Sequence, residues 1–208
     1  LLLHMLLKLC DWDDLEALTA EMEANTRAEL AQGTRVSSTP FSLFGTAVPF
    51  DLQMDATRSE AAAIGAHVAE TKARLAFSYG PRGNKLRVGY ISPDLRSHSA
   101  GRLFQNLLLA HDRSKLEIFG YSLAPKDALD ETTEWFKTHF DEFRDLSDSS
   151  HEESATLIHG DGINVLVDLA SHTKGARPEI LALEPAPVQC HYLGYNLPLG
   201  ADWCRTFF

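Results

Sequence analysis

The sequence LRVGYISPDLRSH, residues 86–98, contains the pattern that decides the fold. Its apolar run from Val88 to Ile91 is typical of a buried parallel strand. The strand ends at Ser92, and a polar loop then leads through His98 into a segment with helical spacing. Open α/β sheets bind ligands beyond the carboxyl ends of such strands, so His98 stands at a candidate site. Position alone leaves two interpretations open, a functional histidine and a solvated or helix-capping loop residue.

Length and composition indicate a globular protein. The chain has 208 residues, of which 44% are hydrophobic, enough for one large domain or for a domain with a helical appendage. The formal net charge of −10 argues against a nucleic-acid partner, because phosphate backbones are bound by basic faces. A small local anion site remains compatible with this charge.

The cysteines and the first residues bear on metal binding and on the cellular compartment. The three cysteines are far apart in sequence and form no CxxC pair, so neither a zinc site nor a disulfide framework is predicted. A reduced, intracellular setting is expected, which means the cytoplasm and, in a eukaryote, also the nucleus. The opening LLLHMLLKLC is too short to span a membrane and is predicted to be an amphipathic helix, so no membrane partner is expected.

The first 84 residues are predicted to be helical and the rest to alternate. We expect helices over residues 1–32, with a break or cap at Asp11, Asp13 and Asp14, and a further helix over 56–77, joined by a Pro- and Phe-rich connector over 33–55. The connector is too apolar for a free linker, and its Phe41, Phe44 and Phe50 are expected to pack. A turn cluster at 80–84 marks the expected boundary, with a helical bridge over 1–84 and a second domain over 85–208.

Strands and helices alternate from residue 85 onward. The predicted strands cover 86–91, 116–122, 143–146, 163–169 and 188–193, and the predicted helices cover 100–110, 130–139, 150–159 and 177–183. Ser150 and Glu153 have the spacing of a capping box. Alternation at these lengths predicts right-handed crossovers and a parallel sheet with helices on both faces, which is a Rossmann-like α/β lobe.

Polar residues follow three of the predicted strands, and in a parallel sheet they gather at one edge. They are Ser92, Asp94 and His98 after the first strand, Asp168, Ser171, His172, Thr173 and Lys174 after the fourth, and Gly194 and Tyr195 after the last. His98 is a candidate general base or hydrogen-bond partner, and Asp168 a candidate to orient it or a sugar hydroxyl. The alternative interpretation of Asp168 is that it caps a helix or forms a turn. The alternative interpretation of His172 is that it is a solvated loop residue.

The segment from Ser171 to Arg177 suits a phosphate or a polar sugar, because it combines hydroxyls with a lysine and an arginine at a predicted helix start. It is not a Walker loop. No GxGxxG follows the first strand, which argues against a dinucleotide oxidoreductase, and neither HExxH nor GxSxG occurs.

Three motifs in order resemble the N-terminal catalytic lobe of the O-linked N-acetylglucosamine transferase family. They read LRVGYISPDLRSHSAG, DGINVLVDLASHTKGAR and PAPVQCHYLGYN, against family patterns of RVGYVSxDFxxH, DGIxxLVDLxGHTxxxR and PAPVQxxWLGYPGT. The upstream CDWDDLEAL and PFSLF are similar to that family's bridge between tetratricopeptide helices and the catalytic region. The resemblance covers essentially the whole chain.

This resemblance implies an activity, a partner lobe and roles for particular residues. Members transfer N-acetylglucosamine from UDP-N-acetylglucosamine to Ser or Thr of intracellular proteins, with inversion and with neither metal nor cofactor. They have two Rossmann-like lobes, and the second lobe, which carries most UDP contacts, is not in this sequence. His98 and Asp161 match the candidate catalytic positions. The candidate donor- and acceptor-binding residues are His172, Thr173, Leu193, Gly194 and Tyr195.

Departures from the family patterns leave two alternatives open. The family's GYPGT is here Gly194-Tyr195-Asn196-Leu197-Pro198, and Ser171 replaces the glycine that usually precedes the histidine of the second motif. One alternative is a non-catalytic lobe that acts as a binding module. The other is a related O-fucosyl or O-glucosyl transferase, since donor choice lies largely outside this lobe.

Overall fold

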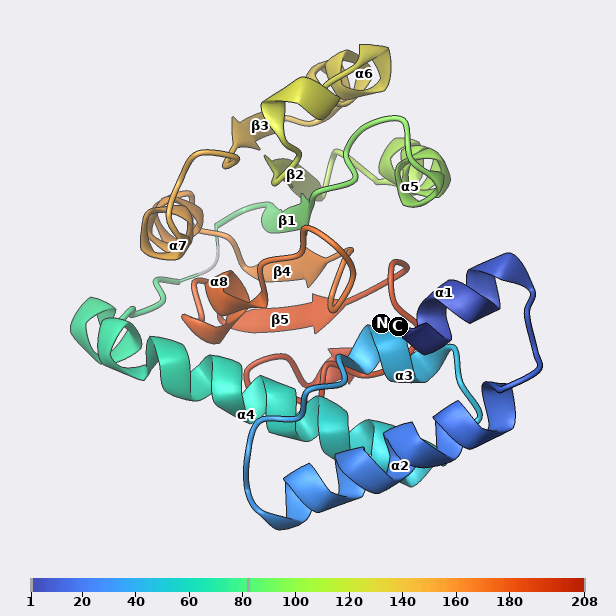
Figure 1. The fold of residues 1–208 in the computed structure, drawn as a ribbon. Helices are drawn as coiled ribbons and strands as arrows, with labels where there is room; N and C mark the ends of the chain where they lie inside the picture. Colours follow the sequence, from blue (N-terminus) through green and yellow to red (C-terminus); the bar gives the residue numbers. More distant parts are fainter. Residues whose placement is uncertain (1, 82, 208) are drawn as a thin grey trace. The chain divides into compact units, whose positions relative to one another are not determined.

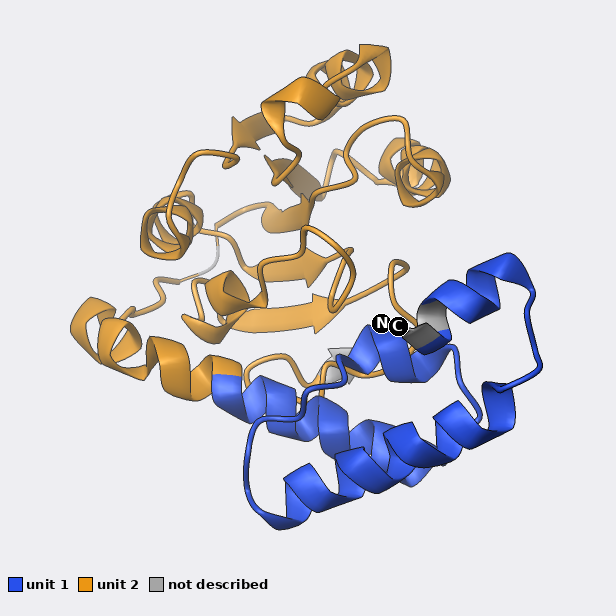
Figure 2. Ribbon diagram, in the orientation of Figure 1, with its two compact units in different colours: residues 1–63 blue, residues 64–208 orange. Residues whose placement is uncertain are grey.

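The structure, a computed structural model, describes residues 2–81 and 83–207 (Figure 1). The chain divides into two compact units, residues 1–63 and residues 64–208 (Figure 2). Each unit has its own hydrophobic core.

The first unit is helical, as predicted. Its elements are α1 (Leu2–Leu9), α2 (Leu15–Ala31), α3 (Pro40–Phe44) and the first part of α4 (Phe50–Leu75). Its core contains Val36, Leu43, Val48, Leu52 and Ala56. Most of these come from the predicted connector, which is therefore a packed part of the unit.

The aromatic residues of the connector do not occupy the positions expected for them. Phe41, Phe44 and Phe50 are exposed, at 45%, 40% and 61% of their surface, so the expectation that they pack in the interior is wrong. The neighbouring aliphatic residues fill the core instead, because short α3 and the start of α4 turn Leu43 and Leu52 inward.

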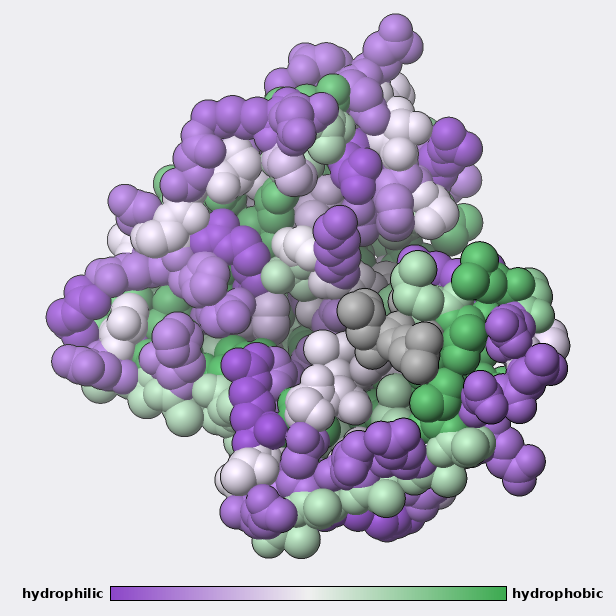
Figure 3. Space-filling view, in the orientation of Figure 1, coloured by the Kyte–Doolittle hydropathy of each residue, from purple (hydrophilic) through white to green (hydrophobic). Residues whose placement is uncertain are grey.

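Helix α4 begins six residues before its predicted start at residue 56. Pro49 precedes the helix, and Leu52 and Ala56 follow at a spacing of four, which places them on one buried face. Figure 3 shows an apolar area over α1, where Met5 and Leu9 are exposed.

The second unit is built on a six-stranded sheet in which every pairing is parallel. The strands are β1 (Leu86–Ser92), β2 (Leu116–Ser122), β3 (Glu142–Asp145), β4 (Val165–Asp168), β5 (Val188–His191) and β6 (Thr206–Phe207). Their order is β3-β2-β1-β4-β5-β6, the order of a doubly wound Rossmann-type sheet. The predicted fold class is confirmed. Among the strands, only the two-residue β6 was not predicted.

Helices cover both faces of this sheet (Figure 1). They are α5 (Ser99–Ala110), η1 (Lys126–Ala128), α6 (Glu131–His139), α7 (His151–Gly160) and α8 (Pro178–Ala182). Successive strand residues alternate between two cores, as the period of two requires. Tyr90 of β1 packs with Phe104 of α5 and Phe136 of α6, whereas its neighbour Ile91 packs with Ile158 of α7.

The division between the units falls inside α4, earlier than the predicted boundary at residues 84 and 85. The reason is that Ile64 and Val68 of α4 are buried in the core of the sheet unit. The domain boundary after residue 84 stays a prediction.

Candidate functional site at the carboxyl edge of the sheet

The direction in which the strands are added reverses between β1 and β4, which makes this the switch point of the sheet. From β1 the chain builds outward through β2 to β3, whereas from β4 it builds in the opposite direction through β5. Ligands of open α/β sheets bind at such a switch point, beyond the carboxyl ends of the strands. The loop that follows β1 contains His98, and the loop that follows β4 contains His172.

These two loops are in contact. Gly175 has φ +86°, and a Cβ built on it would lie 3.1 Å from Cβ of Pro93. Both the left-handed backbone and the close approach favour glycine at this position. The prediction that the loops after the first and fourth strands gather at one edge is therefore confirmed.

His98 is the N-cap of α5, with 43% of its side chain exposed. Its Nδ1 lies 3.3 Å from the backbone N–H of Ala100 and 3.4 Å from Oδ2 of Asp94. The capping role was one of the two interpretations of His98, and the structure shows that a capping histidine also stands at the ligand edge.

The loop that carries His98 is held from several sides. The Asp94 amide donates to Oγ of Ser92 at 3.0 Å, and the Ser97 amide donates to Oδ2 of Asp130 at 2.8 Å. Asp130 is also the N-cap of α6, so one carboxylate anchors both the loop and the helix. Gly101 completes the support, because a Cβ there would overlap the carbonyl oxygens of the loop.

The loop after β4 is built on a buried carboxylate. Asp168 accepts hydrogen bonds from the amides of Ala170 and Ser171, both at 2.9 Å. Burial raises the pKa of Asp168 to about 6, although these two amides favour the ionised form. The interpretation of Asp168 as a turn-forming residue is thus supported, and its contacts with the loop backbone define the turn.

Ser171 adopts a strained conformation next to a buried histidine. Its φ is +54°, in the left-handed region, at the position where the family motif usually has glycine. Its Oγ lies 3.0 Å from Nδ1 of His191, and burial lowers the pKa of His191 to about 4. His191 is therefore neutral near pH 7.

The remaining residues predicted to bind donor or acceptor form a second contact group. The Thr173 hydroxyl donates to the Ala170 carbonyl at 2.8 Å, and Nε2 of His172 lies 3.4 Å from the Leu199 carbonyl oxygen. The rings of His172 and Tyr195 meet edge to face with centroids 5.4 Å apart. The loops after β4 and β5 are thus joined through these side chains.

The turn at Leu193 and Gly194 brings the loop after β5 against β4. Leu193 has φ +77°, and a Cβ on Gly194 would overlap the Leu169 carbonyl oxygen. The backbone at Gly194 therefore lies against the end of β4, within the group of strand-end loops that the sequence predicted.

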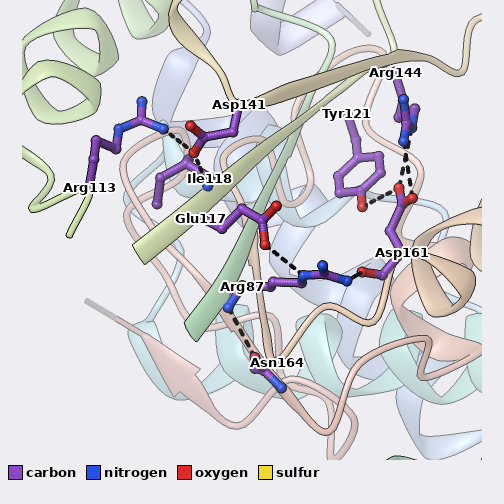
Figure 4. Close-up of polar contacts among 9 residues, drawn as sticks. All are labelled: Arg87, Arg113, Glu117, Ile118, Tyr121, Asp141, Arg144, Asp161 and Asn164. Atoms are coloured by element: carbon purple, nitrogen blue, oxygen red, sulfur yellow. Dashed lines mark hydrogen bonds and ion pairs between the residues drawn. The ribbon is translucent and has the colours of Figure 1, made fainter. Parts of the chain in front are cut away.

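Asp161 lies at the opposite edge of the sheet. Its carboxylate accepts from the Tyr121 hydroxyl at 2.9 Å and from Arg144 at 3.2 Å, and its carbonyl accepts from Arg87 at the start of β1 (Figure 4). The five steps along β1 from Arg87 to Ser92 span about 16 Å, so Asp161 is not brought together with His98. These contacts support a structural role, and the catalytic assignment of Asp161 stays a prediction.

Two contacts at the carboxyl edge of the sheet were not predicted from the sequence. The pairing of Asp94 with His98 was not assigned, although the spacing of four residues is a weak signal for it. His191 was not singled out, because a histidine at the end of a buried strand has no periodic signature. Its contact with Ser171 depends on β5 lying beside β4 in the sheet.

Within residues 2–81 and 83–207, no cluster of three or more His, Cys, Asp or Glu side chains could hold a metal ion. None of the helices in the described ranges is long and apolar enough to cross a membrane.

The fold and the loops at the carboxyl edge of the sheet together define a class of protein. It is a Rossmann-type lobe with its candidate ligand site at the β1/β4 switch point. The family model of glycosyl transferase family 41 matches residues 9–206, so the chain belongs to that family.

The relatives agree with this assignment, and a solved structure has a similar fold. The probable UDP-N-acetylglucosamine–peptide N-acetylglucosaminyltransferase SEC of Arabidopsis thaliana is 31% identical over 97% of this chain and 21% of its own length. The UDP-N-acetylglucosamine–peptide N-acetylglucosaminyltransferase of Caenorhabditis elegans is 38% identical over 58% of this chain and 10% of its own. The K341M mutant of the O-GlcNAc transferase of Thermobaculum terrenum shares the fold, with a TM-score of 0.58 and 24% identity over 91% of this chain and 40% of that one. The chain thus spans about a fifth or less of the curated relatives it matches.

Proposed function

We propose that this chain supplies the N-terminal catalytic lobe of a protein O-glycosyltransferase. The donor would be UDP-N-acetylglucosamine and the acceptors Ser or Thr hydroxyls of intracellular proteins. The observation that carries the proposal is the gathering of the loops after β1, β4 and β5, which hold the three family motifs, at the switch point of the sheet.

In the proposed reaction the hydroxyl oxygen of the acceptor attacks the anomeric carbon while the bond from that carbon to UDP breaks. The hydroxyl proton needs an acceptor, and a half-exposed imidazole at the ligand edge is suited to take it. His172, Thr173 and the turn at Gly194 line the same edge and would contact the sugar or the acceptor. A second lobe would hold most of the diphosphate, and no metal would be required.

The test is transfer of N-acetylglucosamine to acceptor proteins by the full-length protein, with His98→Ala compared with His67→Ala. His67 lies exposed on α4 and serves as the matched control. His98→Ala is expected to lower turnover about 100-fold or more, the usual size of a lost general base, and His67→Ala to leave it unchanged. Unchanged turnover in His98→Ala would remove His98 from the mechanism.

The same assay separates the two alternatives. Transfer from a GDP-fucose or UDP-glucose donor, but not from UDP-N-acetylglucosamine, would identify a related O-fucosyl or O-glucosyl transferase. Absence of transfer from all three donors by the folded full-length protein would favour a non-catalytic binding module.

A further inference from the structure

Nδ1 of His98 has two neighbours that require opposite proton positions. The Ala100 amide, at 3.3 Å, can donate to Nδ1 only when that nitrogen carries a lone pair. The Asp94 carboxylate, whose Oδ2 lies at 3.4 Å, can accept from Nδ1 only when that nitrogen carries a proton. A neutral His98 can therefore satisfy only one of the two.

The choice between these neighbours decides what Nε2 can do. When Nδ1 caps α5, the single proton of the neutral ring is on Nε2, which then cannot accept another. When Nδ1–H donates to Asp94, Nε2 has a free lone pair on the opposite side of the ring. Only the second tautomer can remove a proton through Nε2.

We propose that Asp94 is a positioning residue that holds His98 in the Nδ1–H tautomer, so that Nε2 accepts the proton of the acceptor hydroxyl. This inference rests on the proposed function for its chemical step. In that step the O–H bond breaks as the Nε2–H bond forms, and the oxygen uses its electron pair to attack the anomeric carbon. The resulting imidazolium keeps Nδ1–H on Asp94, which stays ionised.

The surroundings of Asp94 favour this role. Its side chain is only 11% exposed, and its backbone N–H donates a hydrogen bond to Oγ of Ser92, which fixes the backbone at the end of β1. A hydrogen bond to a charged group is stronger than one between neutral groups, so the carboxylate should outcompete the Ala100 amide for Nδ1. The displaced amide is in the first turn of α5, where water can replace the cap.

Other charged groups around the loop do not replace Asp94. Arg96 lies 3.4 Å from Oδ1, the other oxygen of Asp94, and so leaves Oδ2 to the imidazole. Asp130 and Arg102 contact Ser97 rather than the imidazole. Among the contacts of the described residues, Asp94 provides the carboxylate at Nδ1 of His98.

The tautomer of His98 can be measured on the 208-residue chain without substrate, by long-range ¹H–¹⁵N NMR of the imidazole at about pH 8, above the pKa of an ordinary histidine side chain. We expect the Nδ1–H form to predominate in the parent chain and the Nε2–H form in Asp94→Ala. A parent chain with predominantly Nε2–H, or an Asp94→Ala spectrum that keeps Nδ1–H, would overturn the proposal. A parent chain that is predominantly Nε2–H would overturn the proposal even if the variant did not fold.

A matched control separates the direct contact from a general disturbance of the loop. Asp130→Ala removes the bond to the Ser97 amide but touches no imidazole atom, so the Nδ1–H form should persist. A change of tautomer in Asp130→Ala equal to that in Asp94→Ala would mean that loop position, and not Asp94, selects the tautomer.

The effect of Asp94 on turnover is measured with the full-length protein. Asp94→Asn should lower kcat about 10- to 100-fold with little change in KM for the donor, as expected when a partner orients a reacting histidine. An unchanged kcat in a protein that needs His98 would reject the positioning role. If His98→Ala is fully active, the tautomer result still stands as a property of the loop.

Discussion

Gly194 shows how closely the strand-end loops pack on the sheet. A Cβ at this position would overlap the Leu169 carbonyl oxygen, which is backbone and cannot rotate away. Gly194→Ala should therefore force the loop after β5 away from β4 and lower the free energy of unfolding by about 2 kcal/mol or more. Urea unfolding of the 208-residue chain measures this loss.

Gly160 is the matched control for that substitution. It is the last residue of α7, and no atom lies within 4 Å of the point that a Cβ would occupy there. Gly160→Ala should leave stability unchanged or raise it by up to about 1 kcal/mol, because alanine favours helix. Equal effects of the two substitutions would contradict the close approach at Gly194.

At the scale of single residues, positions were easier to predict from sequence than contacts. His98 was predicted at the ligand edge because the end of an apolar run is a local signal. The partners of Asp161 could not be predicted, because Tyr121 and Arg144 come from β2 and β3, far away in the sequence. Only the register of three strands brings them together.

Among the elements, α7 has a cap that can be tested directly. Ser150 accepts from the Glu153 amide at 3.2 Å, and Glu153 accepts in return from the Ser150 amide at 2.8 Å, which confirms the predicted capping box. Ser150→Ala should lower the free energy of unfolding by about 1 kcal/mol. The comparison is Asp14→Ala at the N-cap of α2, whose side chain makes no capping bond and whose loss should have almost no effect.

Thermal or urea unfolding of both variants checks this difference. The result would count against the capping argument if Asp14→Ala were as destabilising as Ser150→Ala. Such an outcome would mean that the charge of Asp14 at the start of α2 stabilises the protein as much as the reciprocal hydrogen bonds of α7 do.

The strands were predicted more accurately than the helical connector. Runs such as INVLVDL have a strong β-branched and apolar signal, and β4 lies inside that run. The connector mixes proline, glycine and phenylalanine, so its local preferences conflict, and its burial pattern is decided by tertiary packing. Strand β6 has only two residues and forms because β5 offers an edge to pair with.

For the whole molecule, two buried groups beside the candidate site give opposite responses to pH. Burial raises the pKa of Asp168 to about 6, so its contribution to stability is present below its ordinary pKa and is lost as pH rises through about 6. Burial lowers the pKa of His191 to about 4, so its contribution is present above its ordinary pKa and is lost as pH falls through about 4. Between about pH 4 and pH 6 the two effects oppose each other.

Single substitutions should separate these effects. The stability difference between the parent and His191→Gln should grow as pH rises from about 4 to 6.5, whereas the difference between the parent and Asp168→Asn should shrink from about pH 4 to 6. For Asp168 the change should be about 2–3 kcal/mol, since one pKa unit corresponds to roughly 1.4 kcal/mol. Urea unfolding at a series of pH values measures both, and slopes of the same sign would refute the assignment.

The pairing of β1 with β4 has a consequence for how the candidate site tolerates change. The two halves of the sheet meet through one ladder, Val88 to Ile91 against Val165 to Asp168, and the loops with His98 and His172 both leave from its end. Their spacing is therefore set by main-chain hydrogen bonds and not by the identity of surface side chains. Substitutions on the outer faces of the helices can accumulate without moving these loops, whereas inserting one residue into either strand would reverse its inward and outward faces and dismantle the site.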